Sequence, residues 1–184
     1  MSSVLSSSIS DVVRSTYNFS VDKFPLFGPE NMKTDQYGLF RSDTGYLNGI
    51  KSVSPRYVPH TTDDVVALCE AASVAFNGVA DVECYFRSGH YVVIRPTIED
   101  RRNVFGTVDS IWPRVIIRAG YDGQAFKASI GYYRDMCHNM HIVRATGRET
   151  STVIRHTQNL RTHMDELIEQ FGQIKAGWSS LDVS

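Results

Sequence analysis

The sequence is poor in cysteine and has no long apolar run. Its three cysteines, Cys69, Cys84 and Cys137, form no CxxC pair and cannot all pair with one another, which favours a reducing compartment over a disulfide framework. The longest apolar-leaning run, residues 65–76, is too short to cross a bilayer and contains Glu70. The first residues lack the basic region of a secretory signal. We therefore expect an intracellular protein with no membrane partner.

A large net charge is also missing, because 19 Lys and Arg residues oppose 20 Asp and Glu residues, for a formal net charge of −1. This balance excludes a histone-like protein and an acidic nucleic-acid mimic as descriptions of the whole chain. The charge is uneven, however: residues 1–79 carry a net −2, residues 80–164 a net +4 and residues 165–184 a net −3. Nearly all cations of the middle block are Arg, whose planar guanidinium can bind phosphate through two hydrogen bonds and stack on a base.

Common motifs of nucleotide, metal and hydrolase chemistry do not occur: the chain has no GxxxxGK[ST], GxGxxG, HExxH or GxSxG. Cys137 and His141 stand four residues apart, but further metal ligands would have to come from Cys84, His90 or His156, so a buried structural cysteine is the better interpretation. A nucleophilic pair of Cys137 and His156 is chemically possible, with no motif to support it. We expect no metal, no cofactor and no enzymatic activity.

The pattern of apolar residues predicts one α+β domain over residues 21–184, preceded by a Ser-rich stretch, 1–20, that forms a short docking helix or a frayed arm. Hydroxyl and carboxylate residues at 61–64 cap a predicted buried helix that ends near Asn77-Gly78. Two hairpins follow, the second around the type I′ turn signal Asp122-Gly123. The paired segments are 82–87 with 91–96 and 114–120 with 124–134.

A long C-terminal helix is expected to cover a face of this antiparallel sheet. Thr150 or Ser151 would cap it, and Gly172 would end it after Phe171. Its apolar residues recur at alternating spacings of four and three, which indicates a core-facing stripe and leaves an oligomer seam as the alternative. Arg155, His156, Arg161 and His163 would flank that stripe, either as a polar rim or as a phosphate-facing edge.

The turn at Asp122-Gly123 also predicts which residues of the second hairpin face each other. One face pairs Ala119 with Phe126, Ile117 with Ala128 and Val115 with Ile130, and is apolar. The other pairs Arg118 with Lys127, Ile116 with Ser129, Arg114 with Gly131 and Trp112 with Tyr133.

Like charges opposite each other across a ladder are destabilising, so the Arg118/Lys127 pair points to an anion above that face. Cations along a phosphate backbone and aromatic rings under bases are what single-strand binding requires. A plain solvated face, where long cationic stems cover apolar surface, is the alternative. The candidate nucleic-acid-binding residues are Arg114, Arg118, Lys127, Trp112, Tyr133, Arg95, Arg101 and Arg102.

Short motifs spread between Tyr37 and Phe171 make the chain similar to the phage/plasmid-like family of uncharacterised proteins. They are Arg41-Ser42-Asp43-Thr44-Gly45 with Arg56-Tyr57, then Arg134 with Cys137 and Asn139, and finally Arg155-His156-Thr157. Met140-His141 departs from the pattern, and family members are usually longer at the C-terminus. The resemblance implies a mobile-element protein in the host cytoplasm and implies no agreed activity.

A looser similarity links residues 80–171 to phage single-strand annealing proteins, whose cores are hairpins followed by a helix and which assemble into rings. Our first hypothesis is a non-enzymatic, homo-oligomeric protein that binds single-stranded nucleic acid in phage recombination or replication. The alternative is a counter-defence or regulatory protein that presents the same arginines to an acidic patch of a host protein.

Overall fold

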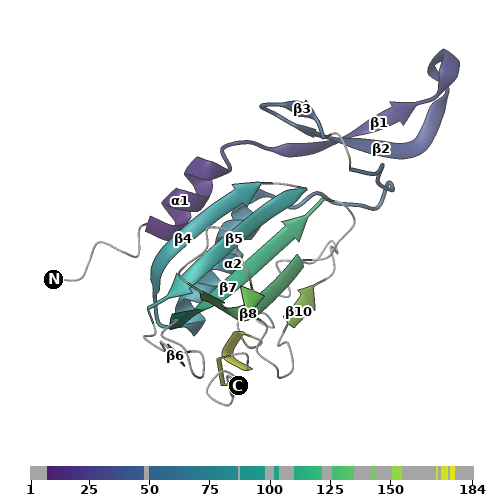
Figure 1. Cartoon of the computed structure of the whole chain (residues 1–184). Helices are drawn as coiled ribbons and strands as arrows, with labels where there is room; N and C mark the ends of the chain where they lie inside the picture. Colours follow the sequence, from purple (N-terminus) through teal and green to yellow (C-terminus); the bar gives the residue numbers. More distant parts are fainter. Residues whose placement is uncertain are drawn as a thin grey trace.

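A computed structural model gives the architecture of the chain as two antiparallel sheets with helices against one of them (Figure 1). The structure describes residues 8–47, 50–86, 88–97, 102–103, 110–121, 126–134, 142–143, 151–154, 169, 171–173 and 175–176. The smaller sheet has three strands in the order β1-β2-β3. The larger has seven, with β10-β8-β7-β5-β4 as its main path, β6 paired to β7 and β9 paired to β8.

The bounds of the elements follow the chain. The N-terminal part contains α1 (Ser8–Thr16), β1 (Val21–Phe27), the 3-10 helix η1 (Pro29–Asn31), β2 (Lys33–Arg41), β3 (Gly45–Tyr46) and α2 (Thr62–Ala75). The large sheet is built from β4 (Val79–Phe86), β5 (Gly89–Pro96), β6 (Arg102–Asn103), β7 (Ser110–Gly120), β8 (Phe126–Arg134), β9 (Ile142–Val143) and β10 (Ser151–Ile154).

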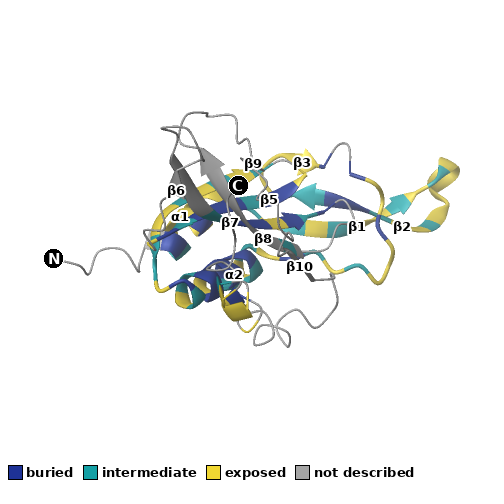
Figure 2. Ribbon diagram, turned by 60° about the horizontal axis from the view of Figure 1, so that its bottom comes forward, coloured by how far each residue is buried: buried dark blue, intermediate teal, exposed yellow. Residues whose placement is uncertain are grey.

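Helix α2 begins and ends as predicted. Thr61 is its N-cap, with its hydroxyl accepting from the backbone N–H of Asp64 while the Asp64 carboxylate accepts from the backbone N–H of Thr61, a complete capping box. Past the helix, Asn77 and Gly78 both have positive φ, of 58° and 117°, and reverse the chain into β4. The apolar positions of α2 face the large sheet, and in Figure 2 its buried and exposed residues lie on opposite sides.

Helix α1 packs beside α2, and together they cover one face of the large sheet. Ile9, Val13 and Tyr17 are buried against α2 and the sheet. The Tyr17 hydroxyl donates to the carbonyl of Tyr85 at 2.8 Å and lies 3.0 Å from that of Tyr91, which ties α1 to β4 and β5. The sheet residues of this core include Val92, Ile94, Val115, Ile117 and Ala119, and Phe171 joins them.

The hairpin of β7 and β8 has the predicted register. Arg118 pairs with Lys127, Ile116 with Ser129 and Trp112 with Tyr133. The β4–β5 hairpin also forms, with Tyr85 opposite Tyr91. A tight turn followed by alternating apolar residues determines such pairings locally, since a slip of one residue would turn the apolar set toward solvent.

The prediction of a sheet packed against a long C-terminal helix is wrong. Residues 151–154, which should form its first turn, are strand β10 and pair with β8 in the register Ser151↔Ser129 to Ile154↔Phe126. After β10, the described residues are helical only at 169, 171–173 and 175–176. The segment Thr152-Val153-Ile154 is β-branched and lies beside an open strand edge, so pairing prevails over helical periodicity. Helices α1 and α2, from the other end of the chain, cover the sheet.

The small sheet forms a ribbon that projects away from the large sheet, toward the upper right of Figure 1. Its inner end is anchored by Leu39, which packs with Leu47, Ile50, Val53 and Tyr121 in a second core. Its outer end is largely exposed (yellow in Figure 2).

Candidate nucleic-acid interface

The face of the large sheet opposite α1 and α2, here called the outer face, is turned toward the viewer in Figure 1. It is made of the residues that alternate with those of the core. From β4 these are Asp81, Glu83 and Tyr85, from β5 Tyr91, Val93 and Arg95, from β7 Arg114, Ile116 and Arg118, and from β8 Lys127.

Arg118 and Lys127 meet on the outer face as directly opposed residues. Arg118 is exposed and Lys127 is half-buried. Within the described part of the chain, neither forms an ion pair, since the two salt bridges there are Arg14–Asp63 and Arg41–Asp43. Two cations in adjacent strands without a carboxylate partner create a positive potential that favours an anion above them.

Two tyrosines of the outer face lie in line with the Arg118/Lys127 pair, on the two strands next to it. The Arg118 guanidinium carbon lies 5.0 Å from the centre of the Tyr91 ring, and the Tyr91 and Tyr85 rings are 6.2 Å apart. Tyr85 is 36% exposed and donates a hydrogen bond to Glu83, which raises the pKa of the phenol to about 12. The row Tyr85–Tyr91–Arg118–Lys127 thus places two rings and two cations across four adjacent strands. Sequence reasoning missed both tyrosines, because the predicted segments 82–87 and 91–96 came with no residue-by-residue register, and the structure pairs Tyr85 with Tyr91.

The remaining predicted cations with described side chains are less accessible. Arg114 and Arg95 are half-buried, and the Nε of Arg95 is buried with no hydrogen-bond partner among the described residues. Between these arginines and Arg118 lie Val93 and Ile116, which are only 7% and 2% exposed, so this part of the outer face is shielded from solvent. The accessible charge is therefore concentrated at Arg118.

Acidic residues limit the positive region on one side. Asp81 and Glu83 are exposed on β4, the edge strand of the sheet. The potential of the outer face therefore changes sign from β4 to β7 and β8, and a polyanion would be directed to the β7–β8 side.

For several other predicted residues the structure describes the backbone and the strand pairing alone. Trp112 pairs with Tyr133, Arg134 pairs with Ile111, and Arg102 lies in β6 opposite Ile111. Predicted residues outside the described ranges are Arg101, Cys137, Asn139, Arg155, His156 and Thr157.

The two cysteines within the described ranges are free. Burial raises the pKa of Cys69, and burial also raises that of Cys84 to about 11. Both are neutral thiols at pH 7 and poor nucleophiles.

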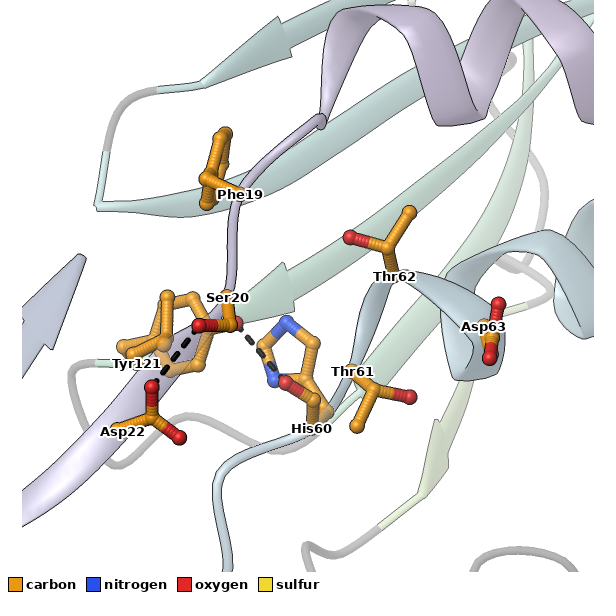
Figure 3. Close-up of a pocket in the computed structure, with 9 residues that line it drawn as sticks. Phe19, Ser20, Asp22, His60, Thr61, Thr62, Asp63 and Tyr121 are labelled. Carbon is orange, nitrogen blue, oxygen red and sulfur yellow. Dashed lines mark hydrogen bonds between the residues drawn. The ribbon is translucent and has the colours of Figure 1, made fainter. Parts of the chain in front are cut away.

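A buried histidine pair lies where the two sheets meet, and sequence reasoning did not find it. His60 Nε2 is 2.8 Å from His90 Nδ1, and both residues are buried. Tyr121 stacks on His60 at 4.1 Å with an angle of 10° and donates from its hydroxyl to the His60 carbonyl (Figure 3). Burial, helped by the charge of Arg41, lowers the pKa of His90 to about 3.

Arg41 links the ribbon to this cluster. Its guanidinium carbon lies 3.7 Å from the Phe19 ring centre and 4.3 Å from that of Phe86, and it pairs with Asp43. The contacts are short and well packed, so they position the ribbon on the large sheet. His60 and His90 are 30 residues apart, and no local spacing could have indicated their contact.

The described residues contain no group of three His, Cys, Asp or Glu side chains arranged to hold a metal ion. Among the described residues, no helix is both long enough and apolar enough to span a membrane.

The fold and this interface define an α+β protein whose large antiparallel sheet has a cationic and aromatic row on its outer face. The chain belongs to the family described as a domain of unknown function, DUF932, which it matches over residues 50–184. The matched region starts after the ribbon and includes α2 and the whole large sheet. No curated protein matches the chain. No solved structure matches it either.

Proposed function

We propose that this protein binds single-stranded nucleic acid on the outer face of its large sheet, without catalysing a reaction. The observation that carries the proposal is the opposed pair Arg118 and Lys127, which has no carboxylate partner among the described residues and continues into Tyr91 and Tyr85. Cations in contact with phosphates and rings under bases give affinity that tolerates sequence.

The same proposal includes the biological setting that the family resemblance implies. We place the protein in phage or plasmid biology, in the host cytoplasm, as an accessory of annealing, recombination or replication that acts as a homo-oligomer. The motifs around Arg41-Ser42-Asp43-Thr44-Gly45 and Arg134 support this setting. The long helix that suggested an oligomer seam does not start as predicted, so self-association rests on the resemblance alone.

Fluorescence anisotropy with a labelled single-stranded oligonucleotide, at several salt concentrations, tests the binding. We expect affinity that falls as salt rises, because bound cations displace counterions from the phosphates. Arg118→Ala should weaken binding and reduce the salt slope. Lys51→Ala is the matched control, because Lys51 is an exposed cation on the loop that precedes α2.

Tyr91→Leu tests the stacking part separately. Loss of a stacked base corresponds to about 1–3 kcal/mol, so affinity should fall with little change in the salt slope. Absence of salt-dependent binding at micromolar protein would refute the proposal. Capture of one host protein after nuclease treatment would instead favour the alternative, in which the same arginines bind an acidic protein surface.

A further inference from the structure

We propose that one face of the ribbon is the contact surface for the ribbon of a second copy of this chain. The inference rests on the homo-oligomer part of the proposed function and names its interface. Eight large apolar side chains are exposed within the described ranges, and half of them lie on the ribbon or at its tip: Phe24, Phe27, Met32 and Tyr46. Such a concentration on one projecting element marks an interaction surface.

The opposite face of the ribbon is covered by the rest of the chain. Leu39 packs there in the second core, and Lys23 lies over the Tyr37 ring and donates to the carbonyls of Pro55 and Tyr57. The residues that alternate with these along the three strands form the other face, here called the open face. It consists of Asp22, Phe24, Leu26, Gly38, Phe40 and Tyr46.

The open face is an ordered aromatic platform. The ring centres of Phe24 and Phe40 are 5.1 Å apart, and those of Phe40 and Tyr46 are 5.2 Å apart. Gly38 lies beneath them, since a Cβ there would be 2.9 Å from the Tyr46 ring and 3.1 Å from Leu26. Rings that are already packed lose little side-chain entropy when a partner covers them.

The exposed apolar area is close to what a stable interface needs. Phe24, Phe27, Met32 and Tyr46 are 50%, 57%, 64% and 42% exposed, which leaves roughly 400 Å² per copy at about 200 Å² for each large side chain. A standard interface buries about 800 Å² per partner, of which somewhat more than half, about 450 Å², is apolar. Contact between two ribbons therefore supplies nearly all of that apolar area.

The charges on and around the open face favour a second copy over a polyanion. Asp22 is the one ionisable residue in the set that defines the face, so nucleic acid or an anionic membrane would meet no cation there. Near the tip, Glu30, Lys33 and Asp35 are exposed and carry both signs. In a two-fold contact the same patch lies on both partners, and a patch with both signs can pair with itself.

Pro25 directs this contact to the face of the ribbon and away from its edge. It lies in β1, the edge strand of the small sheet, and has no N–H to offer to an added strand. The third strand, β3, is only two residues long, so the outer part of the ribbon consists of β1 and β2 alone. A two-stranded ribbon is marginally stable in water, and covering its apolar face stabilises it.

Sedimentation velocity of the full chain over a range of concentrations tests the proposal. We expect the wild-type protein to self-associate. Phe24→Ser and Met32→Ser should each raise the dissociation constant by about 10-fold or more, because a two-fold contact contains every residue twice. Val74→Ser is the matched control and should leave it unchanged, since Val74 is a 71% exposed apolar residue on α2. Thermal melts establish that the three variants are folded.

Binding of labelled Phe24→Ser protein to an excess of unlabelled wild type tests whether the two ribbons meet each other. A contact between ribbons predicts weaker binding than labelled wild type shows, because one of its two halves is altered. Equal affinity would place the wild-type ribbon on another surface of the second copy and overturn the contact between ribbons.

The remaining outcomes separate this interface from the rest of the proposed function. Self-association that neither ribbon variant weakens, or that Val74→Ser weakens as much, overturns the interface and leaves the homo-oligomer in place. Wild-type protein that stays monomeric at high micromolar concentration overturns both, while nucleic-acid binding is measured separately by anisotropy. If that monomer co-sediments with phosphatidylcholine vesicles and Phe24→Ser abolishes this, the open face belongs to a membrane and the proposal is wrong.

Discussion

Substitution of Lys127 by Glu should make the protein more stable and a weaker nucleic-acid binder at the same time. Lys127 lies directly opposite Arg118. The substitution removes a repulsion and adds an attraction, each worth about 0.2–1 kcal/mol across an antiparallel ladder. The free energy of unfolding should therefore rise by about 0.5–2 kcal/mol. For a chain of this size that corresponds to an increase in Tm of roughly 1–8 °C.

Thermal melts at two salt concentrations measure the stability part. The gain in Tm should shrink at about 1 M NaCl, where the Debye length is about 3 Å, because Arg118 is exposed and its interactions are screened. Lys127→Gln removes the repulsion without adding an attraction and should give about half of the gain. Lys51→Glu makes the same change of charge elsewhere and should not raise Tm.

Anisotropy titrations of the same variants measure the binding part. Each phosphate contact that is lost should reduce the salt slope by about 0.7 for a single strand, and the new carboxylate should repel the backbone as well. A Lys127→Glu variant with lower Tm would show that the cross-strand repulsion is wrongly inferred. A variant with higher Tm and unchanged affinity would show that the outer face does not bind nucleic acid.

Three further predictions concern the fold. Gly89→Ala should unfold the chain or lower its Tm strongly, as seen by circular dichroism, because a Cβ there would lie 2.2 Å from the Ala119 carbonyl oxygen. Thr61→Ala should cost about 0.5–2 kcal/mol in urea unfolding through loss of the α2 cap. Urea unfolding across pH should show stability falling as pH drops from about 6.5 toward 3, since the pKa of His90 is about 3 in the folded chain and ordinary in the unfolded one. The unfolded state binds more protons in that window, so one such group contributes a slope of about 1.4 kcal/mol per pH unit.

For each of these three predictions, a control variant tests the proposed physical cause. Gly172→Ala should be tolerated, since no atom lies within 4 Å of a Cβ there, and equal damage at Gly172 and Gly89 would contradict the steric argument. Thr61→Ser keeps the capping hydroxyl and should restore most of the stability. His90→Gln removes the titrating ring, so an unchanged pH slope in this variant would assign the acid sensitivity to other groups.

Short sequence patterns correctly predicted the start of α2 and the β7–β8 hairpin, because both depend on residues that are adjacent in the chain. The capping residues Thr61 and Asp64 located the start of α2, and Asp122-Gly123 was sufficient to align β7 with β8 residue by residue. A cap and a two-residue turn act through hydrogen bonds and dihedral angles of adjacent residues, so they can be recognised without the rest of the fold.

The same reasoning failed at β10 for a physical reason. Residues 151–154 have both a helical period and three β-branched side chains, and the choice between them depends on whether a strand edge is available. That edge belongs to β8, more than 20 residues earlier in the chain.

The amino-acid sequence by itself determined the two hairpins, the capped helix and the register that brings Arg118 opposite Lys127, because all of these arise from short-range patterns. Only the tertiary structure decided that Tyr91 lies beside that pair, that Ile116 is buried between the arginines, and that His60 contacts His90 where the two sheets meet. Such contacts join residues tens of positions apart, and they form because packing and burial of the whole chain offset the entropy of bringing them together.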